Sequence, residues 1–188
     1  MESAPASAAI DAIMAVMERG FDPAFGEAWN RRQVEGALSM PGTFGALISA
    51  DGTVTRAGLM DFAPNMPAGF TLSRHVVDEE ELLLIAVVPD ERGRGLGARL
   101  INRLAQEAEA RGATRLFLEM REDNPARRLY SRLQFKAVGR RPGYYRGRDG
   151  ITRDAITFAR SLISTPEAAD DRSMVPEVGQ KLTNRGGN

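Results

Sequence analysis

The sequence predicts an α/β domain built around one mixed, twisted sheet with helices on its faces. Segments with apolar residues at helical spacing alternate with short apolar runs of strand length through the middle of the chain. Hairpin signals stand near both ends of this region, which indicates that antiparallel strands belong to the same sheet. At 188 residues, the chain is long enough for one domain with a proper core.

Two helices are predicted at the N-terminal end. Residues 7–19 place apolar side chains at helical spacing, and Gly20 ends the pattern. Asn30 and Gln33 stand three residues apart before a second helical pattern, which is typical of a capping box. Trp29 directly precedes this cap.

Three strands are predicted next. Residues 43–49 and 54–60 flank Asp51-Gly52, a dipeptide that favours a hairpin turn. Residues 69–77 have the composition of another strand. The three acidic residues Glu79–Glu81 then indicate an exposed turn before the next apolar run.

The organising stretch of the chain is residues 82–97, LLLIAVVPDERGRGLG. Its seven apolar residues, 82–88, have the length of a buried strand and are too few to span a membrane. Pro89 ends this strand, and a glycine-rich turn leads into a helical pattern that ends at Arg111-Gly112. A strand, a glycine turn and a helix start direct free backbone N–H groups and a helix dipole at one point, which favours a phosphate. The alternative is a helix start whose glycines serve close packing.

The remaining elements follow in the same alternating order. Residues 116–118 form a short strand that leads to Glu119, and Asn124-Pro125 is typical of a helix start. Residues 137–145 and 151–158 resemble a final pair of strands. We therefore expect a single domain over residues 1–162 and a disordered tail over residues 163–188, where apolar residues are few.

Composition excludes several classes of site. The chain has no Cys and one His, which argues against thiol nucleophiles, disulfides, metal catalysis and histidine-dependent triads; no metal site is expected. Residues 1–89 carry 5 basic and 12 acidic side chains, whereas residues 90–160 carry 17 basic and 9 acidic. The basic block begins at the glycine turn, which suits a polyanionic cofactor better than nucleic acid. The N-terminus lacks the pattern of a signal peptide, so we expect a cytoplasmic protein that contacts neither membrane nor nucleic acid.

The spacing Arg92-x-x-Gly95-x-Gly97, after a strand and Pro89, resembles the acyl-CoA-binding motif of the GNAT superfamily of N-acyltransferases. The resemblance spans roughly residues 43–162. It implies a mostly antiparallel sheet, acetyl-CoA as the donor, and a gap between two strands that receives the cofactor's pantetheine arm. By this resemblance, the residues that hold the cofactor are Ile85, Ala86, Val87, Arg92, Gly93, Arg94, Gly95, Leu96, Gly97, Ala98 and Asn124.

Two residues are candidates for proton transfer. Glu119 ends a strand on the same face as Phe117 and is the candidate base, although it could instead be paired with one of the many arginines. Tyr130 lies in a helix that closely resembles the family's helix whose tyrosine donates a proton to the sulfur of CoA. The alternative for Tyr130 is a core tyrosine in a helical stripe.

Within the family, the chain most resembles the bacterial ribosomal-protein alanine N-acetyltransferases. The residues that carry this resemblance are DEEELLLIAVVP (78–89), LEMREDN (118–124), Trp29 and the pair Tyr144-Tyr145. It implies that Trp29, Tyr144 and Tyr145 line the acceptor site and that the acceptor is a protein or peptide N-terminus, such as that of a ribosomal protein. The alternatives are acetylation of a small-molecule amine, and a non-catalytic CoA-binding partner or sensor.

Overall fold

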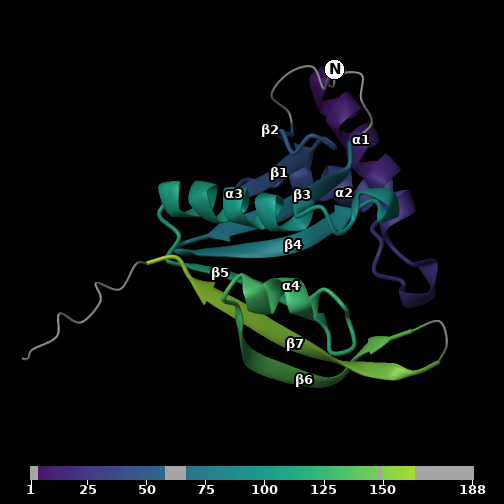
Figure 1. Ribbon diagram of the computed structural model, residues 1–188, viewed down its shortest axis with the longest axis vertical. Helices are drawn as coiled ribbons and strands as arrows, with labels where there is room; N and C mark the ends of the chain where they lie inside the picture. Colours follow the sequence, from purple (N-terminus) through teal and green to yellow (C-terminus); the bar gives the residue numbers. More distant parts are fainter. Residues whose placement is uncertain (1–3, 58–66, 148–149, 164–188) are drawn as a thin grey trace, which may run out of the picture.

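A seven-stranded sheet with the order β2-β1-β3-β4-β5-β7-β6 forms the centre of the computed structural model, which describes residues 4–57, 67–147 and 150–163 (Figure 1). The contact between β4 and β5 is parallel and the other five are antiparallel, which confirms the mixed sheet. The strands are β1 Thr43–Ile48, β2 Val54–Arg56, β3 Gly69–Val76, β4 Glu79–Val87, β5 Arg115–Arg121, β6 Lys136–Arg146 and β7 Thr152–Ser161.

Four α-helices and two short 3-10 helices join these strands. Their bounds are α1 Ala4–Gly20, η1 Pro23–Phe25, α2 Arg31–Ser39, η2 Pro89–Glu91, α3 Leu96–Ala110 and α4 Arg127–Arg132. The predicted capping box of α2 is confirmed, because the Asn30 side chain accepts from the Gln33 N–H and the Gln33 side chain accepts from the Asn30 N–H. Among the described residues, no helix is both long and apolar enough to cross a membrane.

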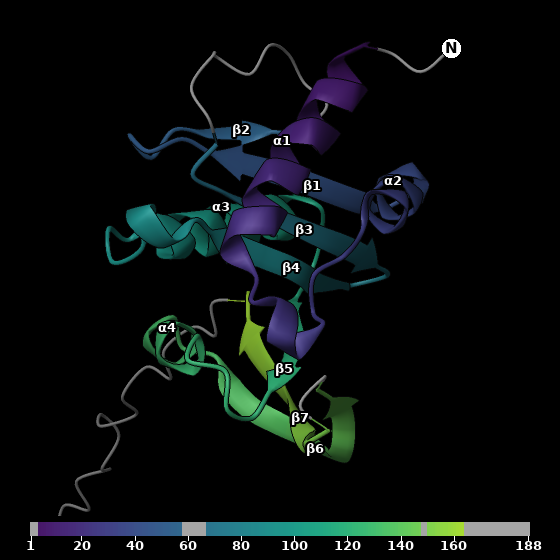
Figure 2. The same ribbon diagram turned by 90° about the vertical axis from the view of Figure 1, so that its right-hand side faces the viewer.

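The helices divide between the two faces of the sheet. Figure 2 shows α3 and α4 to the left of the strands and α2 to the right. On the α3 and α4 side, Ile101 of α3 and Tyr130 of α4 belong to one buried cluster with Leu116 of β5 and Phe158 of β7. On the other side, α1 and α2 pack on β1, β3 and β4. Both faces of the central strands are therefore covered.

The predicted exposed turn at Glu79–Glu81 is wrong, because these residues form the start of β4. They pair with β3, and the two-residue turn lies at Val77-Asp78, where Val77 adopts a φ of 59°. Glu80 is fully buried, and its carboxylate accepts from the Ser73 hydroxyl at 2.6 Å and from Arg111 Nη2 at 2.8 Å. A buried carboxylate is tolerated here because both contacts stabilise its charge.

A β-bulge in β4 lies beside the point where the sheet opens. Leu72 pairs with Leu84 while Ser73 pairs with Leu82, so Leu83 is the extra residue. Because the bulge shifts the alternation by one, Leu82 packs on the α3 side and Leu84 on the α1 side. The bulge thus turns the following residues of β4 relative to the sheet.

The strands β4 and β5 pair over three residues only. The parallel contact joins Glu79–Glu81 to Arg115–Phe117, and in the described structure no pair between these strands follows it. The outer edge of residues 82–87 therefore has no strand partner, although β4 continues to pair with β3 up to Val87. We call this opening between β4 and β5 the splay.

Two predictions fall partly outside the described residues. The predicted strand 54–60 is confirmed as β2 over Val54–Arg56, but residues 58–66 are not described. The predicted tail lies outside the described residues from residue 164 onward. The final predicted strand pair is confirmed as β6 and β7.

Candidate active site

The glycine turn lies between η2 and α3, at the side of the splay. Gly93 and Gly95 adopt φ values of 79° and 81°, and Gly95 is the N-cap of α3. A Cβ on either glycine would meet no atom within 4 Å, so the space in front of the turn is open. The first N–H groups of α3, at Leu96, Gly97 and Ala98, have no acceptor within the helix, and the helix dipole adds positive potential there. The turn therefore has the geometry of an anion site.

The arginines of the turn are engaged by the protein itself. Arg92 donates from Nε to the carbonyl of Val87 at 3.0 Å and from Nη2 to the carbonyl of Gly20 at 2.7 Å. Arg94 pairs with Glu91. Arg92 thus fixes the end of β4 to the end of α1, and the backbone of the turn is what remains available for an anion.

The helices α3 and α4 meet closely beside this turn. A Cβ on Gly97 would lie 3.2 Å from Leu129 Cδ2, so the glycine lets α4 approach the first turn of α3. Close packing therefore accounts for Gly97, while the anion site at Gly93 and Gly95 stays a prediction. The predicted cofactor residues Ile85, Ala86 and Val87 lie along the unpaired edge of β4 in the splay.

Glu119 lies in β5 beyond the last pair with β4, opposite Thr157 of β7. Its Oε2 accepts from Arg141 Nη2 at 2.9 Å, and the side chain is 22% exposed. The structure therefore contains the arginine pair that the sequence left open as an alternative. Arg141 is itself 59% exposed, so an acceptor amine could take its place beside the carboxylate without opening the core.

Tyr130 projects from α4 into the core on the opposite side of the sheet from α1. Its ring packs edge-on against Phe135 and stacks on Phe158, with centroid distances of 5.6 and 6.5 Å. Burial, and then the negative charge of Glu27, raise the pKa of Tyr130 well above its usual value. The hydroxyl therefore stays protonated at neutral pH, as a proton donor requires.

Asn124 shapes the chain before α4. Its Oδ1 accepts from the Ala126 N–H at 2.9 Å, and its carbonyl accepts from the Arg127 N–H at 3.1 Å. The helix begins at Arg127, so Asn124 and Pro125 form a turn ahead of α4 rather than its first residues. The predicted N-cap at Asn124 is wrong, because the N-cap of α4 is Ala126, which makes no side-chain capping bond, and a cofactor contact by Asn124 stays a prediction.

The aromatic residues predicted at the acceptor site separate into two places. Tyr144 and Tyr145 form an edge-to-face pair at 5.2 Å, near a bulge of β6 where Asp154 accepts from the Gly143 N–H. Burial, followed by the charges of Glu119 and Glu27, raises the pKa of Tyr145 to about 12. Trp29 instead packs half-buried against the core on the α1 and α2 side.

A group of ionic residues beside Glu119 was not predicted from the sequence. Arg121 is buried two residues after Glu119, stacks over the Phe25 ring at 3.5 Å, and donates to Glu27 and Asp123. Asp123 also accepts from Arg153 of β7. Because Glu27 and Arg121 are 94 residues apart, no local pattern could indicate their contact.

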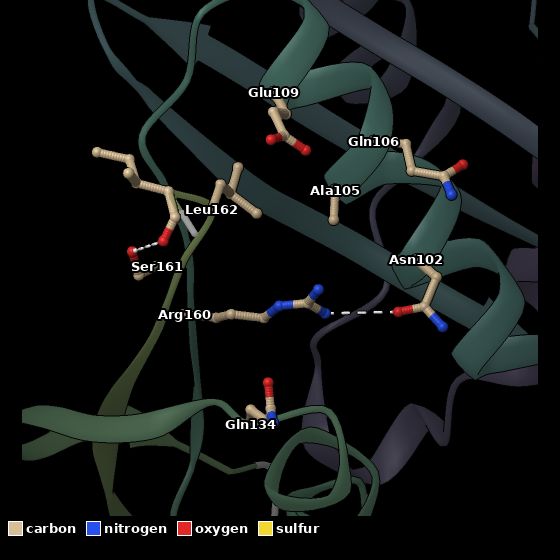
Figure 3. A pocket seen from close by; sticks show the side chains of 9 residues that line it. Asn102, Ala105, Gln106, Glu109, Gln134, Arg160, Ser161 and Leu162 are labelled. Atoms are coloured by element: carbon tan, nitrogen blue, oxygen red, sulfur yellow. Dashed lines mark hydrogen bonds between the residues drawn. The ribbon is translucent and has the colours of Figure 1, made fainter. Parts of the chain in front are cut away.

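A separate cavity of about 430 Å³ lies between the C-terminal half of α3 and the end of β7 (Figure 3). Its lining is polar, and Arg160 Nη1 donates to Asn102 Oδ1 at 3.4 Å across it. None of the predicted site residues lines this cavity. It is therefore distinct from the glycine turn and the splay.

Comparison with known proteins agrees with this geometry. Residues 11–135 match the profile of the acetyltransferase (GNAT) family. The ribosomal protein bS18-alanine N-acetyltransferase of Haemophilus influenzae is 33% identical over 120 residues, which cover 64% of this chain and 82% of that protein. The protein of the same name from Escherichia coli K12 is 42% identical over 93 residues, covering 49% of this chain and 62% of that protein.

Solved structures show the same architecture. The crystal structure of the ribosomal-protein-S18-alanine N-acetyltransferase from Escherichia coli is similar with a TM-score of 0.66 and 28% identity. The similarity covers 92% of this chain and 93% of that structure. The similarity in fold therefore extends over more of the chain than the region matched by the family profile.

Proposed function

This chain belongs to the acetyltransferase (GNAT) family and uses acetyl-CoA, and from that premise we propose that it acetylates the free α-amine of a protein or peptide N-terminus. A ribosomal protein is the acceptor suggested by the names of its relatives, and the cytoplasm is the corresponding place of action. The observation that carries the proposal is that Glu119 lies on β5 beyond the last pair with β4, with its carboxylate partly open to solvent beside the exposed Arg141.

The residues of the turn fit the donor. Two glycines in left-handed conformation leave open space in front of the first N–H groups of α3, as a pyrophosphate requires. Bound acetyl-CoA supplies the thioester that the amine attacks and whose sulfur leaves with a proton. A backbone N–H on the unpaired edge of β4, near Val87, would then stabilise the negative charge that develops on the carbonyl oxygen.

Proton transfer is assigned to two residues that lie on different sides of the sheet. Glu119 is proposed to accept the proton that the acceptor's ammonium must lose before the nitrogen can attack. Tyr130 is proposed to donate its hydroxyl proton to the departing sulfur; its raised pKa keeps the hydroxyl protonated and also makes it a weaker acid. The nitrogen forms the amide bond as the thioester bond breaks, and the second proton that the nitrogen loses restores the hydroxyl of Tyr130. The proton taken up by Glu119 passes to solvent, so the products are the N-acetylated peptide, CoA with a free thiol, and one proton.

The preference for an α-amine follows from acid–base chemistry. An α-amine has a pKa near 7.7–8.0, whereas a lysine side chain has one near 10.4. At pH 7 roughly 10% of an α-amine is neutral, against less than 0.1% of a lysine amine. Deprotonation of the α-amine therefore costs about 3 kcal/mol less, which suits a site with a single carboxylate base.

The test is a competition within one peptide that carries a free N-terminal Ala and an internal Lys. We expect kcat/KM for the N-terminus to exceed that for the lysine by at least about 100-fold. This factor is smaller than the ratio between the neutral fractions of the two amines at pH 7. Mass spectrometry of the fragments locates the acetyl group, and the same peptide with a blocked N-terminus is the control. Predominant lysine acetylation, or turnover of small amines alone, would contradict the proposal.

A further inference from the structure

The loop between α1 and α2 brings a second carboxylate to the acceptor side of the splay. Glu27 follows η1, and its Oε1 accepts from Arg121 Nε at 2.8 Å. Arg121 and Glu119 are two residues apart on β5, so their side chains share one face of the strand. Glu27 is therefore bound to a residue two positions from the candidate base on the same strand face, although it comes from a different part of the chain.

The carboxylate of Glu27 is partly accessible. Burial, and then the charges of Glu119 and Glu27, raise the pKa of Tyr145. The Glu27 side chain is 20% exposed, and in the described part of the chain Oε2 takes no hydrogen bond. A carboxylate oxygen thus remains available to a ligand.

Arg121 binds one oxygen of this carboxylate and leaves the other oxygen to a ligand. The guanidinium is buried, is stacked on Phe25, and divides its donors between Glu27 and Asp123. In the sheet, Arg121 is in register with Ala155 and Arg141, so a small residue separates the two arginines. Arg121 consequently fixes Glu27 to the end of β5, while Glu119 is paired with the more exposed Arg141.

We propose that Glu27 binds the protonated N-terminal ammonium of the acceptor peptide through Oε2, before Glu119 removes its proton. The inference rests on the proposed function. An N-terminal ammonium has three donors, so it can contact both carboxylates and the Tyr145 hydroxyl together. Glu27 is a binding residue in this scheme and transfers no proton itself.

The experiment compares two inhibitors with the enzyme loaded with CoA. One is an acceptor peptide with a free N-terminal amine, and the other is the same peptide with a hydroxyl in place of that amine. We expect the wild-type protein to bind the amine peptide at least tenfold more tightly by calorimetry. Glu27→Gln should remove this preference by weakening the amine peptide alone, with the affinity for CoA and for the hydroxyl peptide unchanged.

Asp123→Asn is the matched control, because it removes the other carboxylate partner of the same Arg121. If Glu27 served only to pair with Arg121, both variants would weaken both peptides alike, and that result would overturn the inference. So would an amine preference that persists in Glu27→Gln and disappears in Glu119→Gln. If the wild-type protein does not prefer the amine peptide over the hydroxyl peptide, that result alone overturns the inference.

The same data separate the two proposals. A wild-type protein that acetylates N-termini while Glu27→Gln keeps its amine preference contradicts the role of Glu27 alone. A wild-type protein that neither acetylates nor binds the amine peptide contradicts both the proposed function and this inference.

Discussion

At the scale of single residues, the catalytic assignment depends on whether the acceptor amine can replace Arg141 as the partner of the Glu119 carboxylate. The pair is bonded at 2.9 Å, but both side chains reach solvent. Exposed ion pairs of this kind contribute little to stability, so exchanging Arg141 for an incoming amine costs little. Glu119 can therefore pair with Arg141 while the acceptor is absent and serve as the base once the acceptor is bound.

Glu119→Gln should lower kcat at pH 7 by about 10²-fold, the lower limit for a lost general base. Its rate should partly recover as pH rises past 8, because more of the α-amine is then already neutral. Steady-state kinetics against pH is the measurement. Arg141→Gln is the control: a similar loss in this variant would show that the ion pair, rather than proton transfer, is what Glu119 supplies.

At the scale of the elements, the turn before α3 depends on glycine for two separable reasons. Gly95 has a left-handed φ that side chains disfavour, and it leaves open space for a ligand. Gly112, beyond the other end of the same helix, also has a left-handed φ and open space around it. The two positions therefore share the backbone requirement and differ only in their distance from the anion site.

We expect Gly95→Ala to lower the affinity for acetyl-CoA at least tenfold, because its Cβ occupies the space in front of the free N–H groups. Both variants should lower the free energy of unfolding by about 1–2 kcal/mol, the cost of a left-handed conformation. Gly112→Ala should leave the affinity for acetyl-CoA unchanged. Calorimetric titration and thermal unfolding measure the two effects. Equal affinities in the two variants would remove the anion site from this turn.

The elements also show what the sequence could and could not predict. Local patterns were sufficient for the capping box at Asn30, the hairpin at Asp51-Gly52 and the helix that carries Tyr130. They failed at Glu80, whose acidic neighbours indicate a turn while its partner Arg111 lies 31 residues away. Local signals cannot report a charge that is neutralised by a distant residue.

The same limit applies to the candidate site. The glycine turn, Glu119, Tyr130 and the tyrosine pair have recognisable spacing, whereas Glu27 and Arg121 have none. Arg121 is one of many arginines in the sequence, and only the packing of η1 on β5 distinguishes it. A motif contained in one element can be recognised from the sequence, whereas a contact between the two halves of the chain cannot.

At the scale of the whole molecule, Glu80 stands where the two parts of the sheet meet. It pairs with Leu116 across the short parallel contact, and its carboxylate binds Arg111 at the end of α3. His75 Nδ1 lies 3.2 Å from Oε2 on the other side. A buried, bonded carboxylate therefore connects β3, β4 and α3 at the closed end of the splay.

Glu80→Gln should lower the free energy of unfolding by about 3 kcal/mol, as expected when a buried ion pair loses one charge. Glu81→Gln, at the next position of the same strand, removes the more exposed partner of Arg74 and should cost less than about 1 kcal/mol. Urea unfolding monitored by circular dichroism compares them. Equal losses would show that the buried network contributes no more than a surface pair.

The brevity of the β4–β5 contact has a consequence for the opening motions of the molecule. Three residue pairs join β1–β4 to β5–β7, so the two groups of strands form natural units for separate local unfolding. A ligand that bridges the turn of α3 and the edge of β5 adds a second connection between these units. Acetyl-CoA at 100 times its Kd would then stabilise the joined state by about 2.7 kcal/mol. Bound acetyl-CoA would thus hold the two groups of strands together as well as react. Backbone amides of β5–β7 should therefore exchange with solvent more slowly when it is bound.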